Sequence, residues 1–210
     1  MIPIRVDRRG MSKMSYEVDG VGSPATFEPG TSLLMTGTSM LTQQRLLDAV
    51  APNDDERAIV ITTNLDAGRV VEELEERGAD REQIGVIDCT GQKTAVEETP
   101  VRQLSSPGDL TGISLEFAKL LDQSDEEESG PVRVGFASVS TALMYAELQT
   151  MFRFLHVFTA RIRSGDMFGV FAMDPAMHEE KAHNTIRAVF DCEAKVADEN
   201  VELRGTGFEQ

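Results

Sequence analysis

Residues 33–47 read LLMTGTSMLTQQRLL and join a short apolar run to a segment with helical spacing. Residues 33–36 form the apolar run, and Gly37 lies where the chain would turn. Leu41, Leu46 and Leu47 then give the following segment an apolar side. A strand, a tight turn and a helix that starts over the turn are the elements from which phosphate-binding loops are built. The stretch therefore predicts an α/β fold and shows where a nucleotide would bind.

The same alternation of short apolar runs and helical segments continues along the chain, as expected for a mostly parallel sheet with helices on both faces. We expect residues 1–29 to form a polar N-terminal arm and residues 30–210 to form one α/β domain. The expected strands are Ser32–Gly37, Ala58–Thr62, Ile84–Asp88, Val132–Ala137 and Met167–Met173, with a final hairpin-like pair, Cys192–Ala197 and Val201–Arg204. The expected helices are Leu41–Ala51, Asp66–Arg77, Asp109–Leu121, Ser140–Arg163 and Glu179–Phe190, and Asp122–Pro131 is expected to be an acidic loop.

The predicted helix Ser140–Arg163 carries an unusually wide apolar face. One continuous stripe follows helical spacing, and Phe152, Phe154 and Val157 add apolar area beside it. Either all of this face is core, or part of it meets a partner. The residues of the stripe are Met144, Leu148, Met151, Leu155, Phe158 and Ile162.

The charge is strongly acidic, with 36 Asp and Glu against 20 Lys and Arg and a net charge of −16. Such a chain is either simply an acidic soluble protein or one adapted to a cytoplasm near molar salt, where a Lys-poor, carboxylate-rich surface stays hydrated. In both cases the charge opposes binding to nucleic acid and to anionic membranes, because both need Lys and Arg against phosphates. The candidate basic patch is local and lies at Arg5, Arg8, Arg9 and Lys13.

The high-salt interpretation makes a prediction about stability. We expect the midpoint of thermal unfolding to rise from dilute to molar KCl, because a Debye length of about 3 Å at 1 M screens the repulsion between carboxylates. Melting curves at several KCl concentrations measure this midpoint. A midpoint that stays level or falls with salt would contradict the interpretation.

Two cysteines, Cys89 and Cys192, are too few and too far apart for a disulfide framework or a four-ligand zinc site. We expect both to be buried thiols in a reducing cytosol. No apolar run approaches the roughly 20 residues that span a bilayer, and no signal peptide is recognised at the N-terminus. The expected location is cytoplasmic.

The turn region departs from a working phosphate loop at the positions that carry its chemistry. A working loop reads G-x-x-x-x-G-K-[ST], in which glycines free backbone N–H groups for the phosphates, Lys neutralises charge and the hydroxyl holds Mg²⁺. Gly37 supplies the first glycine, but Thr42, Gln43 and Gln44 occupy the other three positions. A left-handed Thr42 would cost about 1–2 kcal/mol, so we expect the loop to be reshaped as well as uncharged. The candidate site is a degenerate, non-binding loop made of Gly37, Thr38, Ser39, Thr42, Gln43 and Gln44.

The order of segments resembles the KaiC-like branch of the RecA-fold ATPases over about residues 30–205. Residues 33–47 resemble that family's LLVSGTSGTGKT loop, aligned on Gly37, Thr38 and Ser39. Residues 133–141, RVGFASVST, resemble its Walker B strand, and residues 152–163, FRFLHVFTARIR, resemble the FRFLHVLTGRIR helix of KaiC-related haloarchaeal proteins. Residues 171–178 resemble its following strand and Asp-Pro turn, and 201–205 its C-terminal strand. The resemblance implies a RecA-like sheet.

Carried over residue by residue, the resemblance implies that catalytic groups have been lost. The Walker B aspartate corresponds to Ala137, and where the family has its catalytic carboxylate pair, just after the second strand, this chain has Thr63, Asn64 and Leu65. Together with Gln43 in place of Lys, these changes leave no dedicated metal ligand, no base and no charge against a triphosphate.

Other candidate constellations are weak. His178 and His183 stand five residues apart, so they do not match the H-E-x-x-H zinc pattern, and we expect no metal. His156 is expected to be packed or hydrogen-bonded. Residues 88–91, DCTG, either line a residual pocket or simply end a strand and shape its loop.

These observations predict a pseudo-ATPase with no cofactor that acts through a protein partner or as a homo-oligomer, in a regulatory or scaffold role. The alternative is a nucleotide sensor or weak ATPase whose site is completed by a neighbouring chain or by an unconventional residue such as Arg45.

Overall fold

The computed structural model describes residues 15–21, 25–92, 94–122, 130–197 and 200–209. Eight strands form the main sheet in the order β10-β9-β3-β8-β7-β4-β5-β6, and every neighbouring pair except β9 with β10 is parallel. The strands are β3 (Ser32–Thr36), β4 (Arg57–Thr62), β5 (Ile84–Asp88), β6 (Val101–Gln103), β7 (Val132–Phe136), β8 (Phe168–Met173), β9 (Cys192–Ala197) and β10 (Asn200–Gly205).

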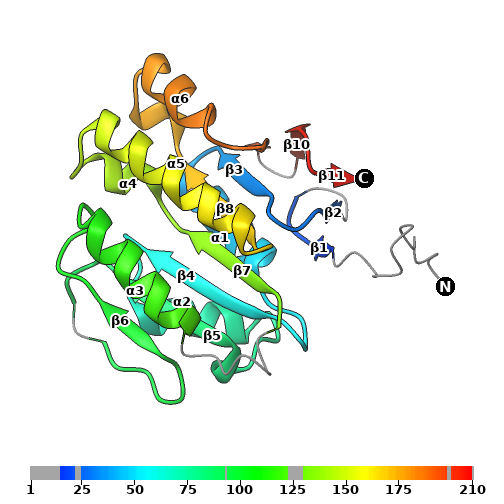
Figure 1. Ribbon diagram of the computed structural model, residues 1–210, viewed down its shortest axis with the longest axis vertical. Coiled ribbons are helices and arrows are strands. Elements are labelled where there is room, and N and C mark those ends of the chain that lie inside the picture. The colour runs from blue at the N-terminus through cyan, green and yellow to red at the C-terminus, as the bar shows by residue number, and fades with distance from the viewer. Residues whose placement is uncertain (1–14, 22–24, 93, 123–129, 198–199, 210) are drawn as a thin grey trace.

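Helices cover both faces of this sheet (Figure 1). One face carries α1 (Ser39–Val50) and α2 (Ala67–Glu75). The other carries α3 (Leu110–Asp122), α4 (Val139–Leu143), α5 (Leu148–Ser164) and α6 (Glu180–Arg187). Two short 3-10 helices, η1 (Arg81–Gln83) and η2 (Pro175–Met177), lie in the connections. This arrangement is the α/β, RecA-like architecture that the sequence predicts.

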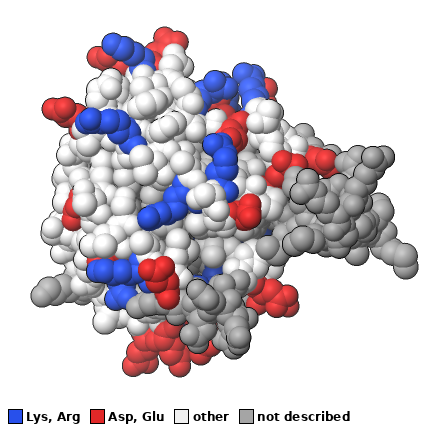
Figure 2. Space-filling model, viewed as in Figure 1, with Lys and Arg blue, Asp and Glu red and all other residues white. Residues whose placement is uncertain are grey.

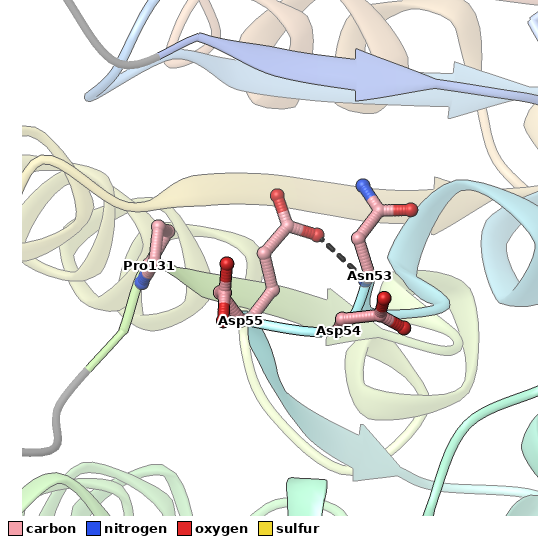
Figure 3. Close-up of a pocket in the computed structure, with 5 residues that line it drawn as sticks. Asn53, Asp54, Asp55 and Pro131 are labelled. Atoms are coloured by element: carbon pink, nitrogen blue, oxygen red, sulfur yellow. Dashed lines mark hydrogen bonds between the residues drawn. The ribbon is translucent and has the colours of Figure 1, made fainter.

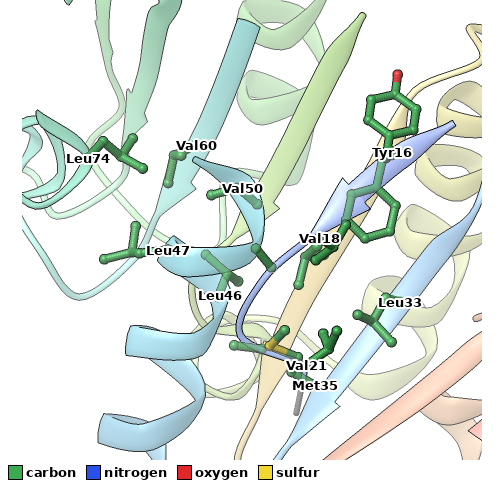
Figure 4. Close-up of a cluster of buried hydrophobic side chains, with 14 of the residues drawn as sticks. Tyr16, Val18, Val21, Leu33, Met35, Leu46, Leu47, Val50, Val60 and Leu74 are labelled. Atoms are coloured by element: carbon green, nitrogen blue, oxygen red, sulfur yellow. The ribbon is translucent and has the colours of Figure 1, made fainter. Parts of the chain in front are cut away.

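Side chains alternate between the two faces of the strands, and each face contributes to its own hydrophobic core. Leu33 and Met35 point toward α1, whereas Leu34 points toward α5, as expected when successive side chains face opposite sides of a sheet. Both faces are apolar, which is typical of buried parallel strands. Figure 4 shows the cluster under α1, where Leu46, Leu47 and Val50 meet the sheet.

The N-terminal residues add an element that the sequence did not indicate. β1 (Tyr16–Val18) and β2 (Ala25–Phe27) pair antiparallel, and β2 also pairs with β11 (Phe208–Glu209) near the C-terminus. Tyr16, Val18 and Phe27 are buried in the core under α1. The division at residues 29 and 30 stays a prediction, and the structure adds that residues 16–21 and 25–27 contribute to the same core as the sheet.

A buried ion pair ties this hairpin to the sheet. Arg133 in β7 is 2% exposed and donates to both carboxylate oxygens of Glu56, at 2.6 and 3.2 Å. Its remaining N–H groups reach the carbonyl oxygens of Ala49, at 2.9 Å, and Glu17, at 2.7 Å. The guanidinium also lies 5.7 Å from the centre of the Tyr16 ring. The Arg133 side chain therefore links β7, in which it lies, to α1, to β1 and to the residue that precedes β4.

The prediction of a single helix over Ser140–Arg163 is wrong, because the helix is interrupted between α4 and α5. Tyr145 and Ala146 bond back to the carbonyl of Ala142, and α5 begins only after Glu147. Tyr145 packs against Gly108, where an added Cβ would lie 2.9 Å from the Tyr145 Cβ. The neighbouring loop thus accounts for a break that neither Gly nor Pro signals. The break also removes Met144 from the stripe and leaves its side chain 69% exposed.

The rest of the apolar stripe is divided between core and surface. Met151, Leu155, Phe158 and Ile162 are buried, while Val157 is 68% exposed. The acidic loop expected at 122–131 lies largely outside the described residues. Among the described helices, none is long and apolar enough to cross a membrane.

Candidate functional site

The carboxyl ends of β3, β4, β7 and β8 meet where an open α/β sheet places its ligands. The structure brings together here several positions that the sequence comparison singles out in separate segments. The residues that line this place are Ser39, Thr42, Asn64, Ala137, Ser138, Ala172, Met173 and Asp174. The gap between them is about 180 Å³ and too narrow to admit a water molecule. Protein atoms therefore fill this part of the sheet edge.

The turn after β3 is shorter than a phosphate loop. Only Gly37 and Thr38 separate β3 from α1, which begins at Ser39. Thr42 lies inside the helix and is buried, and its hydroxyl donates to the carbonyl of Thr38 at 3.0 Å. Residues 39–44 are thus helical. Their backbone N–H groups, apart from those of the first turn, donate to carbonyl oxygens within the helix.

Gly37 packs closely against β9. A Cβ at this position would lie 2.5 Å from the backbone oxygen of Val196 in β9. Contact distances below about 3.0 Å do not occur for real Cβ atoms. Close packing against β9 therefore accounts for this glycine.

A carboxylate of the protein sits at the N-terminus of α1. Asp174 Oδ2 accepts from the backbone N–H of Ser39 at 3.1 Å and from its hydroxyl at 3.0 Å. Free N–H groups and the helix dipole make such a terminus favourable for an anion. Asp174 is itself held by Ser140, whose hydroxyl bonds to its backbone N and O. The Asp174 carboxylate thus supplies the negative charge at the N-terminus of α1.

The other predicted positions make neutral contacts. Gln43 Oε1 accepts from Asn64 Nδ2 at 2.9 Å, and Thr63 Oγ1 donates to the carbonyl of Ser138 at 3.1 Å. Ala137 directly follows β7 and is buried. Gln44 is exposed, and Thr38 stands at the N-cap of α1 without a side-chain cap bond. No lysine or arginine lines the gap, so the charge that its lining supplies is negative.

A larger hollow of about 500 Å³ lies at the opposite, amino edge of the sheet (Figure 3). Its lining comes from the residues before β4 and β7, namely Asn53, Asp54, Asp55, Glu56 and Pro131. The Glu56 carboxylate accepts a hydrogen bond from the backbone N–H of Asn53 at 2.9 Å. Glu56 is paired with Arg133, and the carboxylates of Asp54 and Asp55 oppose a phosphate ligand here because like charges repel.

A model of one protein family matches residues 30–196 of this chain, and its description is a family of unknown function, DUF7504. The chain belongs to DUF7504. No curated protein matches the sequence.

Solved structures show the fold of this DUF7504 chain. It is similar to a KaiC-like protein from the hyperthermophilic archaeon Pyrococcus horikoshii, with a TM-score of 0.58 and 14% identity over 84% of this chain and 77% of the other. A second Pyrococcus horikoshii protein is similar with a TM-score of 0.57 and 14% identity, over 86% and 88% of the two chains. At this identity the likeness shows a RecA-like fold of the KaiC-like kind.

Residues 88–91 of this DUF7504 chain shape a loop. The Asp88 carboxylate is buried and accepts from the N–H of Ala67 at the start of α2, and from the N–H and hydroxyl of Thr90. Gly91 has a φ of +77° and closes the turn. Asp88 is thus fully occupied, which favours the loop-shaping interpretation over a residual pocket.

The histidines and cysteines offer no catalytic arrangement. His156 is exposed and stacks on Phe152, so the expectation of a packed histidine is wrong. His178 precedes α6, and burial lowers its pKa; His183 lies 3.4 Å from Glu193. Within the described residues no group of His, Cys, Asp and Glu is placed to hold a metal. Burial raises the pKa of Cys89 and of Cys192 to about 12, so neither thiol is activated.

Sequence reasoning missed Asp174 and Ser140 as site residues. Asp174 directly follows the buried strand β8 and precedes Pro175, which starts η2. The signal in the sequence that could have indicated Asp174 is its place at the carboxyl end of a central strand. Its partner, the N–H of Ser39, lies 135 residues away in the sequence, and only the fold brings the two together.

Proposed function

We propose that this chain is a non-catalytic relative of KaiC-like ATPases, a pseudo-ATPase that works through protein contacts as a regulator or scaffold. The observation that carries the proposal is the contact between Asp174 and Ser39. An internal carboxylate at the N-terminus of α1 competes with a triphosphate for the same donors and repels its charge.

The groups that hydrolysis needs are replaced by residues that cannot supply them. Ala137 has no side-chain oxygen to order a magnesium-bound water, and Asn64, which is hydrogen-bonded to Gln43, is not a base. Gln43 makes only a neutral contact where a lysine would face phosphate. In this proposal, the degenerate loop and the degenerate Walker B strand together account for the lack of hydrolysis.

The proposed setting is a cytoplasm with high salt, as in the haloarchaeal proteins that the helix at residues 152–163 resembles. The net charge of −16 supports this setting and argues against nucleic acid or anionic membrane as the partner. The partner in this proposal is a protein, either another chain or a second copy.

The proposal predicts that the protein does not bind Mg·ATP with useful affinity. Charge-assisted hydrogen bonds contribute roughly 1.5–3 kcal/mol each, so loss of the lysine and of one or two other contacts weakens binding by at least about 100-fold. Calorimetric titration with ATP and Mg²⁺ in molar KCl measures this affinity. A micromolar dissociation constant would contradict the proposal and favour the alternative of a nucleotide sensor.

A further inference from the structure

Contacts between molecules of this protein must hold at the ionic strength of its proposed setting. A Debye length of about 3 Å at 1 M salt screens the attraction between exposed charges. Figure 2 shows that on the face carrying α5 the Lys and Arg side chains are spread among uncharged ones rather than gathered into one patch. Backbone hydrogen bonds and apolar contacts are the interactions that such salt leaves largely intact. An exposed strand edge offers both.

The two edges of the main sheet differ in how they are protected. β6 forms one edge and is only three residues long. β10 forms the other edge, near the C-terminus in Figure 1, and all six of its residues pair one to one with β9. Natural sheets protect their edges with short strands, bulges, lysines or prolines. The length of β6 protects it, whereas β10 contains no bulge, lysine or proline.

The outer edge of β10 presents backbone groups that β9 does not use. Thr206, which directly follows β10, donates its N–H to the carbonyl of Asp191 at 3.2 Å. Backbone groups of successive residues in a strand point to opposite edges, so the even-numbered residues of β10 also turn toward β9. The N–H and C=O groups of Val201 and Leu203 therefore point outward. Among the strands that the structure describes, none pairs with this edge.

The same strand has an apolar side and a charged side. Val201 and Leu203 are half-buried and pack against the core under α1, so part of each side chain is exposed. Glu202 and Arg204 lie on the opposite side, are exposed, and bond to each other at 2.7 and 3.0 Å. A strand that pairs with this edge has to match both sides.

We propose that β10 of one copy of this chain pairs antiparallel with β10 of a second copy, about a two-fold axis at Leu203. In this register the outward N–H of Leu203 donates to the carbonyl of the same residue in the other copy, and the reverse bond forms as well. The two main sheets then become one continuous sheet. The inference rests on the proposed function, in which the chain acts through protein contacts, and it names one partner.

The strand is self-complementary in this register. Leu203 lies beside its own counterpart, and the contact covers the exposed part of both side chains. Val201 lies opposite Gly205, which places no side chain between the strands. Glu202 lies opposite Arg204 in both halves of the pair, whereas a shift by two residues would place Glu202 against Glu202 or Arg204 against Arg204. The charges thus select the register, while the hydrogen bonds and the leucines supply the affinity.

The contact is symmetric and uses the same surface of both copies. Such an interface closes at two copies. The expected species is therefore a dimer, and its dissociation constant should not rise from dilute to molar KCl, because screened charges do not hold it together.

Paired cysteine variants test both the contact and its register. Glu202→Cys and Arg204→Cys place thiols at positions that face each other across the axis as a non-hydrogen-bonded pair, with Cα atoms about 4.5 Å apart. This separation lies within the range of a disulfide. An equimolar mixture of the two variants, treated with oxidised glutathione in molar KCl, is expected to give at least about tenfold more disulfide-linked dimer than either variant alone. The native Cys89 and Cys192 are buried and do not compete.

A backbone variant tests which interaction holds the dimer together. Leu203→Pro removes an N–H that β9 does not use, whereas Leu203→Ala shortens the side chain and keeps that N–H. The proline is expected to weaken dimerisation by at least about 100-fold, and the alanine by about tenfold or less. Sedimentation equilibrium in dilute and in molar KCl measures these dissociation constants, and thermal unfolding checks that each variant folds.

The matched control is Arg69→Cys, at an exposed position on α2, which should give only background linkage when it is mixed with Glu202→Cys. A wild-type protein that stays monomeric at high concentration, a cysteine mixture that links no better than this control, or a dissociation constant that rises with salt would overturn the inference. If Leu203→Pro fails to fold, the cysteine mixture still decides. ATP titration measures a site at the carboxyl end of β3, so the proposed function is judged separately.

Discussion

Replacing Arg133 by methionine is expected to lower the free energy of unfolding by about 3–5 kcal/mol, because Glu56 then stays buried without its cation. The carbonyl oxygens of Ala49 and Glu17 lose their donors in the same change. For a chain of this size each kcal/mol shifts the unfolding midpoint by roughly 2–4 °C. Denaturant and thermal unfolding at fixed salt measure both quantities.

The matched control is Arg204→Met, at an exposed pair with Glu202. This substitution is expected to lower the free energy of unfolding by less than about 1 kcal/mol, since exposed ion pairs contribute little to stability. Arg133→Met combined with Glu56→Met is expected to recover part of the loss, because it removes both buried charges. If Arg133→Met costs no more than the control, the ion pair does not hold the hairpin to the sheet.

Restoring the loop alone is expected to leave nucleotide binding weak, whereas restoring it together with Asp174→Ala should strengthen binding by at least about tenfold further. The loop changes are Met40→Gly, Thr42→Gly, Gln43→Lys and Gln44→Thr. They return the glycines, the lysine and the hydroxyl, but Asp174 still occupies the N–H of Ser39. Calorimetry with ATP and Mg²⁺ compares the two variants.

Asp174→Ala in the otherwise unchanged chain serves as the control, and it should bind no nucleotide because the lysine is still missing. If a folded variant with all five changes also binds nothing, residues 33–47 are not a former phosphate loop. If the loop changes alone restore full binding, Asp174 is not the competitor.

Most of the sheet could be predicted from sequence because its strands are apolar on both faces. Ile84–Asp88 and Cys192–Ala197 match the predicted bounds, and the other central strands differ by one residue. β6 was missed because it is only three residues long and partly exposed. β1 and β2 were missed for a similar reason: each is three residues long, and β11, which pairs with β2, lies 181 residues beyond it in the sequence.

The candidate site was predictable in part. Ser39, Thr42, Asn64 and Ala137 were singled out from sequence and do line one place. The start of the helix two residues earlier than predicted, at Ser39 rather than Leu41, could not be derived, because Ser and Met accept both loop and helix. The role of Asp174 could not be derived either, since it depends on which helix terminus the end of β8 faces.

The pairing of β2 with β11 bears on the order in which the chain folds. Phe27 packs against Phe208, which is synthesised 181 residues later, with ring centres 5.7 Å apart. Contacts so distant along the chain are slow to form, because the intervening segment must be ordered first. The small sheet can therefore close only after the C-terminal residues have left the ribosome. Until then Tyr16 and Phe27 lack part of their final surroundings and remain exposed to chaperones and proteases.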